Sequence, residues 1–416
     1  MKKTRFYLPR RWGEKIILFI VTFLFLLFFS TDFGLIDIQK TAIILAAGID
    51  RTEDGNFSVT AQIAVPEASK SGGAAQATAI SGSGETIARA FQEINTKTGW
   101  FPKLIFCDLI VLGETVTQGN VFDCLSYFMR NEQMSDNCLL AACEGSAQEI
   151  LTATTPTESM PALALQKILA TEAKESGNIS TVNLKDFAAD YFSAHKSGYM
   201  PFLFLLPQTE SGQGGQSGEG GQSGGGAQTA AAAQDNGQSG QSGKGQKSSV
   251  FYGACTAVFY DGKLKTVLTR EESFALNLVV GKVRQATLQV PLPDGTAYAL
   301  SLTDVKGKIN LQTKDNLPRL KIGLKAVARV SDCTVPKSIE NIASTNTVRE
   351  ELLQKAEELL ARDLSAVFEK CRENQCDIFG ALDRLQKYHT TFYNAYKEDL
   401  LARIVPAFEI RVRDSD

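Results

Sequence analysis

Residues 41–50, TAIILAAGID, are followed after a short polar segment by residues 57–65, FSVTAQIAV, and this pair of segments decides the fold class. In the second segment, apolar residues alternate with polar or small ones, which is typical of a strand with one buried face. The intervening residues 51–56 are RTEDGN, so the pair is predicted to form a β-hairpin. Pro66 ends the second strand, and the small, polar residues 67–84 predict a loop.

Strand and helix patterns alternate downstream of this hairpin. Apolar residues at helical spacing predict helices near residues 87–98, 122–129, 163–170 and 184–192, and apolar runs predict buried strands at residues 104–112 and 138–143. This order predicts a mixed α/β layer over residues 35–208, which we expect to form the N-terminal domain.

Residues 209–249 consist almost entirely of Gly, Ser, Gln and Ala. They include no aromatic and no branched aliphatic side chain, so they cannot bury enough apolar surface to offset the entropy lost on ordering. The segment is predicted to be a disordered linker or loop insertion.

Residues 250–335 have mostly strand patterns and are predicted to form a middle domain. Strands at residues 251–260 and 264–268 flank the turn Asp261–Gly262, and strand patterns return from residue 286 onward. Between them, residues 269–272, TREE, have the sequence of a capping box and predict the start of a helix.

Residues 336–416 are predicted to form a C-terminal α/β domain around one long amphipathic helix. Residues 347–350, TVRE, have the sequence of a second capping box at its start. The segment 402–412 alternates as a strand, and Pro406 predicts an edge or bulged strand because proline has no N–H for a sheet ladder. The fold class is thus α/β with mixed, α+β-type sheets.

The N-terminus combines a basic arm with an apolar run. Residues 1–15 contain six Lys and Arg side chains and one acid, and residues 16–31 are predicted to be a membrane anchor or signal, with the basic arm left in the cytoplasm. The apolar side chains expected to carry the anchor are Ile16, Ile17, Leu18, Phe19, Leu24, Phe25, Leu26, Leu27, Phe28 and Phe29. The run is shorter than the roughly 20 residues of a spanning helix, so a cleaved signal is the alternative. No Ala-x-Ala site follows it, which favours an uncleaved anchor.

Charge and cysteine settings exclude some function classes. The chain of 416 residues has a net charge of −3, and without the basic arm it is more acidic still, so we expect no nucleic-acid partner. Its eight cysteines lie mostly within apolar patterns, which favours free, buried thiols. Cys371 and Cys376 are the pair predicted to bond if any does.

No constellation of residues predicts chemistry. Only His195 and His389 exist, each beside aromatic residues of a predicted helix, and both are interpreted as structural. The spacings Cys138-x4-Cys143 and Cys371-x4-Cys376 lack nearby histidines, so no metal site is predicted. The glycine clusters lack the strand–loop–helix context of a phosphate loop. We therefore predict no catalytic, cofactor-binding or metal-binding residues.

Several short segments, in this order along the chain, resemble the Ger(x)C family. They are GID at 48–50, VTAQIAVP at 59–66, FMR at 128–130, GSAQEIL at 145–151, GACTAVFYDGKLKTVL at 253–268 and CDIFG at 376–380. The family-motif positions are Gly48, Asp50, Arg130, Asp377, Ile378, Phe379 and Gly380. The segment Asp377–Gly380 after a long helix is the most specific part of the resemblance.

The resemblance implies a C subunit of a spore germinant receptor, which catalyses nothing and acts with polytopic A- and B-type subunits. It implies three α/β domains outside the spore inner membrane or cell membrane, and a germinant that does not bind this subunit directly. Such subunits typically have a lipid-accepting cysteine, whereas Ser30, Thr31, Asp32 and Phe33 stand at that place here, so residues 16–29 are expected to anchor the chain in a single pass. The alternatives are an exported solute-binding or cell-envelope module, and a cysteine hydrolase.

Overall fold

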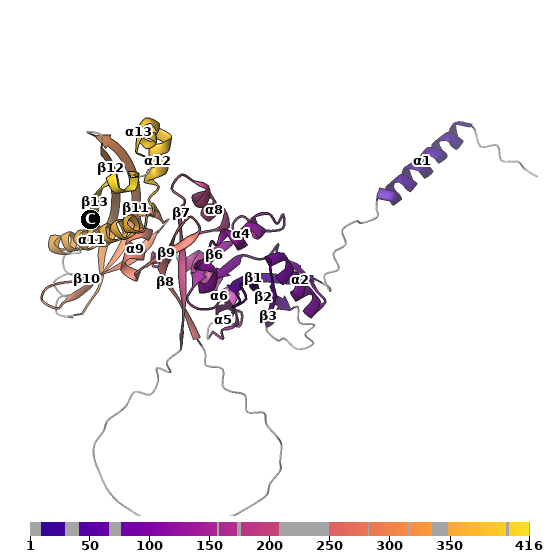
Figure 1. The fold of residues 1–416 in the computed structure, drawn as a ribbon, viewed down its shortest axis with the longest axis horizontal. Helices are drawn as coiled ribbons and strands as arrows, with labels where there is room; N and C mark the ends of the chain where they lie inside the picture. Colours follow the sequence, from indigo (N-terminus) through magenta and orange to yellow (C-terminus); the bar gives the residue numbers. More distant parts are fainter. Residues whose placement is uncertain are drawn as a thin grey trace, which may run out of the picture.

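The computed structural model describes residues 10–29, 41–65, 76–155, 158–172, 176–207, 249–281, 283–314, 317–334, 348–396 and 399–415. Within these residues the chain forms two mixed β-sheets, which lie side by side along the long axis of the molecule (Figure 1). The fold class is therefore α/β with mixed sheets, as predicted. Apart from Ser249, the expected linker lies outside the described residues.

The first sheet has nine strands in the order β3-β2-β1-β5-β6-β7-β8-β9, with β4 also beside β1. Its centre, β1-β5-β6-β7, is parallel, and the outer strands on both sides are antiparallel. The strands are β1 (Thr41–Arg51), β2 (Phe57–Val65), β3 (Gln76–Gly84), β4 (Phe101–Lys103), β5 (Leu109–Leu112), β6 (Leu139–Cys143), β7 (Ser197–Pro207), β8 (Ser249–Tyr260) and β9 (Lys263–Leu268).

Helices cover both faces of this sheet. One apolar core forms beneath α2 (Ile87–Thr98), α4 (Phe122–Met129) and α8 (Leu184–Phe192). A smaller core on the opposite face lies beneath α5 (Ala147–Thr152) and α6 (Pro161–Lys167). The short α3 (Glu114–Thr117) follows β5, and the π-helical turn η2 (Ile168–Glu172) follows α6.

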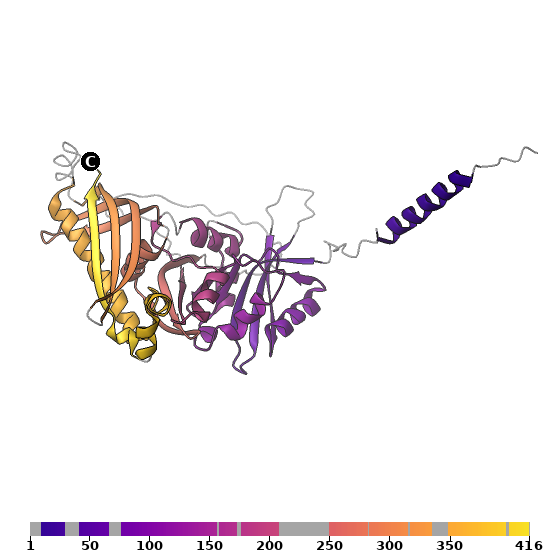
Figure 2. The ribbon, with the colours of Figure 1, turned by 90° about the horizontal axis from the view of Figure 1, so that it is seen from above.

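The second sheet has four strands in the order β10-β11-β12-β13, and β13 pairs parallel to β12. Its strands are β10 (Gln285–Pro291), β11 (Ala297–Lys314), β12 (Leu317–Cys333) and β13 (Val405–Asp414). The helices around it are α9 (Arg270–Val280), α11 (Glu350–Glu373), α12 (Ala381–Tyr388), α13 (Thr390–Ala395) and α14 (Leu400–Arg403). Figure 2 shows α11 running along one face of the long strands β11, β12 and β13.

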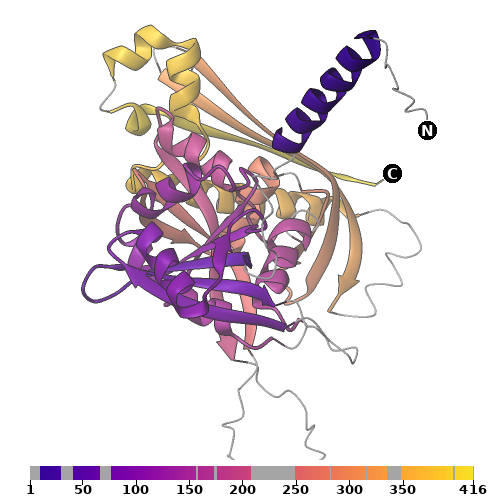
Figure 3. The ribbon, with the colours of Figure 1, turned by 90° about the vertical axis from the view of Figure 1, so that its right-hand side faces the viewer.

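A single core links the two sheets. It begins at Val258 of β8 and Leu268 of β9, continues through α9, and includes the inner faces of the second sheet and α11. Viewed end-on, the first sheet lies in front of the second (Figure 3). The segments expected as a middle domain are thus shared, since β8 and β9 belong to the first sheet and β10 to β12 to the second. The division into domains 35–208, 250–335 and 336–416 stays a prediction.

The predicted hairpin is confirmed, because β1 and β2 pair antiparallel. The prediction of a loop over residues 67–84 was wrong where the structure describes the chain, since β3 pairs with β2 along its whole length. The sequence of β3, QATAISGSG, consists mostly of small and polar residues and therefore has the composition of a loop. Its glycines serve packing: a Cβ on Gly82 would collide with the Ala90 carbonyl oxygen of α2, so only a strand of small residues lets α2 lie this close.

One of the two predicted capping boxes is confirmed. Thr269 accepts from the Glu272 amide while the Glu272 side chain accepts from the Thr269 amide, and α9 begins there. The box at residues 347–350 is not tested in full, because Thr347 lies outside the described residues; α11 begins at Glu350, later than predicted, and Arg349 before it makes no side-chain cap. The Val348 amide, two residues before the helix, donates to Asp414 Oδ2 at the end of β13 (2.9 Å).

The N-terminal run forms a helix, α1 (Arg10–Phe29), which stands apart from the two sheets (Figure 1). Its large apolar side chains from Ile16 to Leu26 are 45–71% exposed. No helix in the described part of the chain, α1 included, is long and apolar enough to span a membrane. The predicted spanning segment is therefore not supported. Residues 16–29 extend about 21 Å at 1.5 Å per residue, against roughly 30 Å of bilayer hydrocarbon.

Candidate functional site at the junction of the two sheets

The most specific family-motif segment, Asp377–Gly380, lies where the C-terminal helices meet the first sheet. It connects the end of α11 to the start of α12 through two residues with left-handed backbone, Gln375 (φ 60°) and Gly380 (φ 64°). Only glycine adopts this conformation without steric cost, so Gly380 permits the turn into α12. The Arg384 side chain locks the same turn by donating to the carbonyl oxygens of Phe379 (2.6 Å) and Gly380 (2.7 Å).

Asp377 ties this turn to the first sheet. Its backbone amide donates to Ser197 Oγ of β7 (2.9 Å), and its own Oδ2 accepts from the Leu382 amide at the start of α12 (2.6 Å). The residue is only 3% exposed, and burial raises the pKa of its carboxyl group, while the hydrogen bonds from α12 act in the opposite direction. Asp377 therefore joins β7 to α12 and does not face solvent.

His195 makes a second link between the same two elements. Its Nδ1 accepts from the Ser197 amide (3.0 Å), and its Nε2 lies 3.3 Å from Asp383 Oδ2 on α12. The other oxygen of Asp383 accepts from the Ala194 amide (3.0 Å). Because the Ser197 N–H donates to Nδ1, the neutral ring carries its proton on Nε2, which faces the Asp383 carboxylate.

The carboxylate of Asp190 lies beside His195 and belongs to the same cluster of polar side chains. Its Oδ1 is 3.9 Å from His195 Nε2. Burial raises the pKa of Asp190 to about 6, against the opposing influence of His195, and the charges of Asp186 and Asp383 contribute in the same direction as burial. Two carboxyl groups, those of Asp190 and Asp383, thus lie within 4 Å of His195 Nε2 at the junction.

A hollow of about 700 Å³ opens beside this cluster of polar side chains around His195. It is lined from the first sheet by Asp190, His195 and Tyr199, and from the C-terminal part by Phe379, Asp383 and Lys387, among others. Burial raises the pKa of the Tyr199 hydroxyl, which stays protonated at neutral pH. The hollow is therefore polar and joins residues from both halves of the chain.

The junction lacks the geometry of a nucleophile–base pair. Ser197 Oγ donates to the carbonyl oxygen of His195 (2.7 Å), so its proton is not directed at the imidazole ring. The nearby thiols of Cys371 and Cys376 are buried, and burial raises the pKa of Cys376 to about 12 and that of Cys371 further. Thiols in such settings are protonated and unreactive. What the arrangement can do is hold α12 in one position on β7.

The apolar residues of the motif support the same position. Phe379 is 3% exposed and its ring centroid lies 6.2 Å from that of Phe368 on α11. Ile378 is also buried. The two side chains therefore fix the turn to the core that links the two sheets.

The other family-motif positions lie elsewhere. Asp50, at the end of β1, accepts through Oδ1 from the Ala147 amide (2.9 Å) and through Oδ2 from the Gln148 amide (3.0 Å) and Ser146 Oγ (2.9 Å). It therefore caps α5, where a negative charge is favoured. Gly48 lies beneath α5, with a Cβ there 3.0 Å from the Leu151 side chain.

Arg130, the remaining motif position, ends α4 on the exposed surface. Its Nε donates to the Ser126 carbonyl oxygen (3.0 Å) on the same helix. The motif positions thus occupy three separate places: beneath α5, at the end of α4, and at the junction. Their functional role stays a prediction.

Seven of the cysteines, including Cys371 and Cys376, are free thiols, as expected. His389 contacts Thr313 Oγ1 through Nδ1 (3.3 Å) and lies apart from His195 in the fold. Within the described part of the chain, no group of three or more His, Cys, Asp or Glu side chains could hold a metal ion.

Sequence reasoning missed Asp190 and Asp383 as partners of His195. Asp190 is five residues from His195, so helical proximity could have indicated it. Asp383 is 188 residues away and belongs to the other half of the chain, and no local pattern indicates that contact.

Comparisons with known proteins identify the family of the chain. Residues 35–205 match the family model described as spore germination protein N-terminal domain, and residues 255–413 match that described as spore germination B3/GerAC like, C-terminal. Spore germination protein B3 of Bacillus subtilis (strain 168) is 22% identical over 388 residues, which cover 91% of each chain. The crystal structure of the GerBC protein is 16% identical and has a TM-score of 0.48, over 89% of this chain and 97% of that chain. Because both domain models match, in order, the chain belongs to the Ger(x)C family of spore germination receptor subunits.

Proposed function

We propose that the protein is the C subunit of a spore germinant receptor and acts there as a non-enzymatic component. The observation that carries the proposal is the ordered match of the two spore germination models over residues 35–205 and 255–413. The junction supports a structural role, because His195, Asp377 and Asp383 use their polar atoms to hold α12 against β7. Function would then reside in protein contact surfaces.

The proposed partners are two polytopic membrane subunits of A and B type. A chain with an affinity tag, purified from spore membranes in mild detergent, is expected to retain two polytopic proteins in constant ratio. Spores that lack the chain are expected to lose the response to a nutrient while still germinating by routes that bypass nutrient receptors. Recovery of the chain without any polytopic protein, together with normal nutrient germination, would contradict the proposal.

We also propose that α1 holds the protein at the spore membrane, with the bulk of the chain on the outer side. The support is the exposure of its apolar side chains between Ile16 and Leu26 and the basic residues before them. Mass measurement of the intact membrane-bound protein tests this: the uncleaved, unlipidated chain is expected. A chain that begins near Ser30, or one that carries a diacylglycerol adduct, would show a different mode of attachment.

A cysteine hydrolase is the enzymatic alternative, and the settings of the thiols give it little support. Burial raises the pKa of Cys124 to about 12 and raises those of Cys138 and Cys143 further. Substitution of each cysteine by serine, and of each histidine by glutamine, is expected to cause only stability defects. A variant with full stability and assembly but no germination response would favour the hydrolase.

A further inference from the structure

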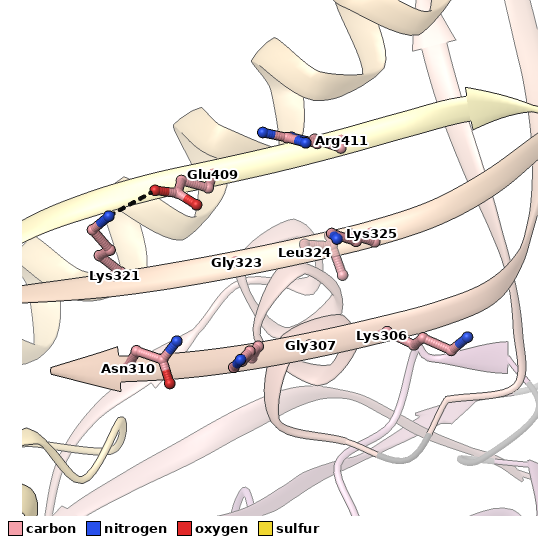
Figure 4. Close-up of a pocket in the computed structure, with 10 residues that line it drawn as sticks. Lys306, Gly307, Asn310, Lys321, Gly323, Leu324, Lys325, Glu409 and Arg411 are labelled. Carbon is pink, nitrogen blue, oxygen red and sulfur yellow. Dashed lines mark ion pairs between the residues drawn. The ribbon is translucent and has the colours of Figure 1, made fainter.

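The outer face of the second sheet carries a concentrated positive charge. Helices α9 and α11 pack on the opposite face, and the outer face has a hollow of about 490 Å³. Its charged lining consists of five cations, Lys306, Lys308, Lys321, Lys325 and Arg411, and one carboxylate, Glu409 (Figure 4). Since the whole chain has a net charge of −3, this concentration is local and does not reflect composition.

The strand register places like charges directly opposite one another. Lys325 of β12 is the register partner of Lys306 on β11 and of Arg411 on β13, so three cations form one row across three strands. Like charges opposite one another destabilise a sheet. Lys321 pairs with Glu409 (3.3 Å), but within the described residues no ion pair involves the three cations of the row.

Gly323 lies at the centre of this charged surface. Lys321 and Lys325 are two residues away on the same strand, and Lys308 and Glu409 are its register partners on either side. A glycine within a strand weakens it, and often marks a place where a ligand comes close to the backbone.

The fold does not require glycine at position 323. Its φ is not in the left-handed region, and a Cβ there would meet only the carbonyl oxygens of Lys308 (3.5 Å) and Glu409 (3.8 Å), which are ordinary contacts. By contrast, a Cβ on Gly307 of β11 would collide with the Val279 carbonyl oxygen of α9. Gly307 is therefore explained by packing, whereas no close contact requires glycine at position 323, and its absence of a side chain leaves the outer face open there.

We propose that the hollow over Gly323 binds more than one phosphate group at once, carried by one soluble ligand or by neighbouring lipid headgroups. The row from Lys306 through Lys325 to Arg411 crosses two strand spacings, about 10 Å, which exceeds the reach of a single small anion. Lysine ammonium groups bind phosphate as point charges, and the arginine adds two parallel N–H donors. Glu409 is neutralised by Lys321 at one side, which leaves the row for the anion. The phosphates belong to a soluble compound or to lipid headgroups, and the two sources are separable by experiment.

Binding is tested with the full chain in nonionic detergent and with the full chain added to vesicles. The soluble probe is tripolyphosphate, measured by calorimetric titration, and the membrane probe is phosphatidylcholine vesicles with and without phosphatidylglycerol. The wild type is expected to bind tripolyphosphate saturably if the source is soluble, or to bind the phosphatidylglycerol vesicles more strongly than the phosphatidylcholine ones if it is lipid. The basic N-terminal arm contributes equally to every variant, so the differences between variants report on the hollow.

Two variants separate binding from folding. Gly323→Val fills the hollow with a side chain that suits a strand, and K325Q/R411Q removes two cations of the row. Each is expected to keep the wild-type melting temperature or raise it, while the affinity falls at least about tenfold. The matched controls are Gly119→Ala, where a Cβ also has only ordinary contacts, and K263Q/R270Q, which removes two exposed cations elsewhere.

Three outcomes would overturn the proposal. The first is that neither probe binds the wild type, and the second is that Gly323→Val or K325Q/R411Q binds as tightly as its control. The third is that only an acidic polypeptide such as polyglutamate binds, which would identify the face as a protein contact. None of these measurements depends on receptor assembly, so the test is independent of the proposed germination role.

Discussion

At the scale of residues, the junction shows how a motif can be structural and still specific. Asp377 and His195 are buried and make polar contacts that join β7 to α12, while Asp383, whose side chain is 41% exposed, contacts His195 and the Ala194 amide. Buried polar groups that are fully satisfied specify one arrangement, because an incorrect arrangement leaves them without partners. The segment Asp377–Gly380 therefore defines where the C-terminal helices sit.

Phe379→Ala tests the apolar part of this junction. Phe379 is 3% exposed and packs against Phe368, so truncation is expected to lower the free energy of unfolding by about 3–5 kcal/mol. Chemical denaturation of the purified chain measures the change. Phe101→Ala is the control, since Phe101 is 63% exposed and should cost less than about 0.5 kcal/mol. Equal losses in the two variants would contradict the packing described.

Asp190→Asn tests the electrostatics of the junction. The pKa of Asp190 is raised from 3.8 to about 6 by burial, so its ionisation disfavours the folded state, and wild-type stability falls as pH rises through this range. The full shift corresponds to about 3 kcal/mol, but the side chain is 36% exposed, and solvent screening reduces the expectation to about 1 kcal/mol. Denaturation is measured at pH 4 and pH 7. Between these two pH values, the free energy of unfolding of the variant should rise by about 1 kcal/mol relative to that of the wild type. Asp54→Asn in an exposed turn is the control, and no difference between the two variants would refute the assignment.

At the scale of elements, local chemistry decides what the sequence could reveal. The Thr269 capping box and the hairpin of β1 and β2 were predictable, because the residues that form them are close in sequence. β3 was missed because its glycines, which lie beneath α2, have the composition of a loop, and the contact of Val348 with Asp414 before α11 was missed because Asp414 comes from the far end of the chain. In both errors a contact with a distant element replaced the local signal.

Lys325→Gln tests the row of cations across β11, β12 and β13. Because Lys306 and Arg411 are both its register partners, removal of this charge is expected to raise the free energy of unfolding by about 0.2–1 kcal/mol at low ionic strength. In 1 M salt the gain should largely disappear, since the Debye length falls to about 3 Å. Urea denaturation at both ionic strengths measures it, with Lys263→Gln as the control. A loss of stability at low salt would mean that Lys325 has a favourable partner.

At the scale of the whole molecule, the arrangement of the sheets was beyond sequence reasoning. β8 and β9 follow the linker and were expected in a separate domain, yet they extend the first sheet. A buried network connects them to the rest: Ser180 Oγ lies 2.7 Å from Thr256 Oγ1 of β8 and donates to Asn277 Oδ1 of α9 (2.9 Å). Each member is unremarkable alone, so only the fold reveals the set. Residues of the candidate site could likewise be named in part, through Asp377–Gly380 and His195, but not as one site.

The last prediction concerns the chain between β7 and β8. Pro207 and Ser249 are register partners in an antiparallel pair, so the linker leaves and re-enters the sheet at one point. Removal of residues 214–243 leaves about eleven residues to close this hairpin. The entropic cost of loop closure rises with the logarithm of loop length, so the shorter loop costs less to close. Thermal and urea unfolding should show a stability gain of about 1 kcal/mol. Replacement of the same residues by a Gly/Ser sequence of equal length should leave stability unchanged, because only length matters if the segment makes no contacts. If both variants are less stable than the wild type, the linker packs against the folded part of the chain.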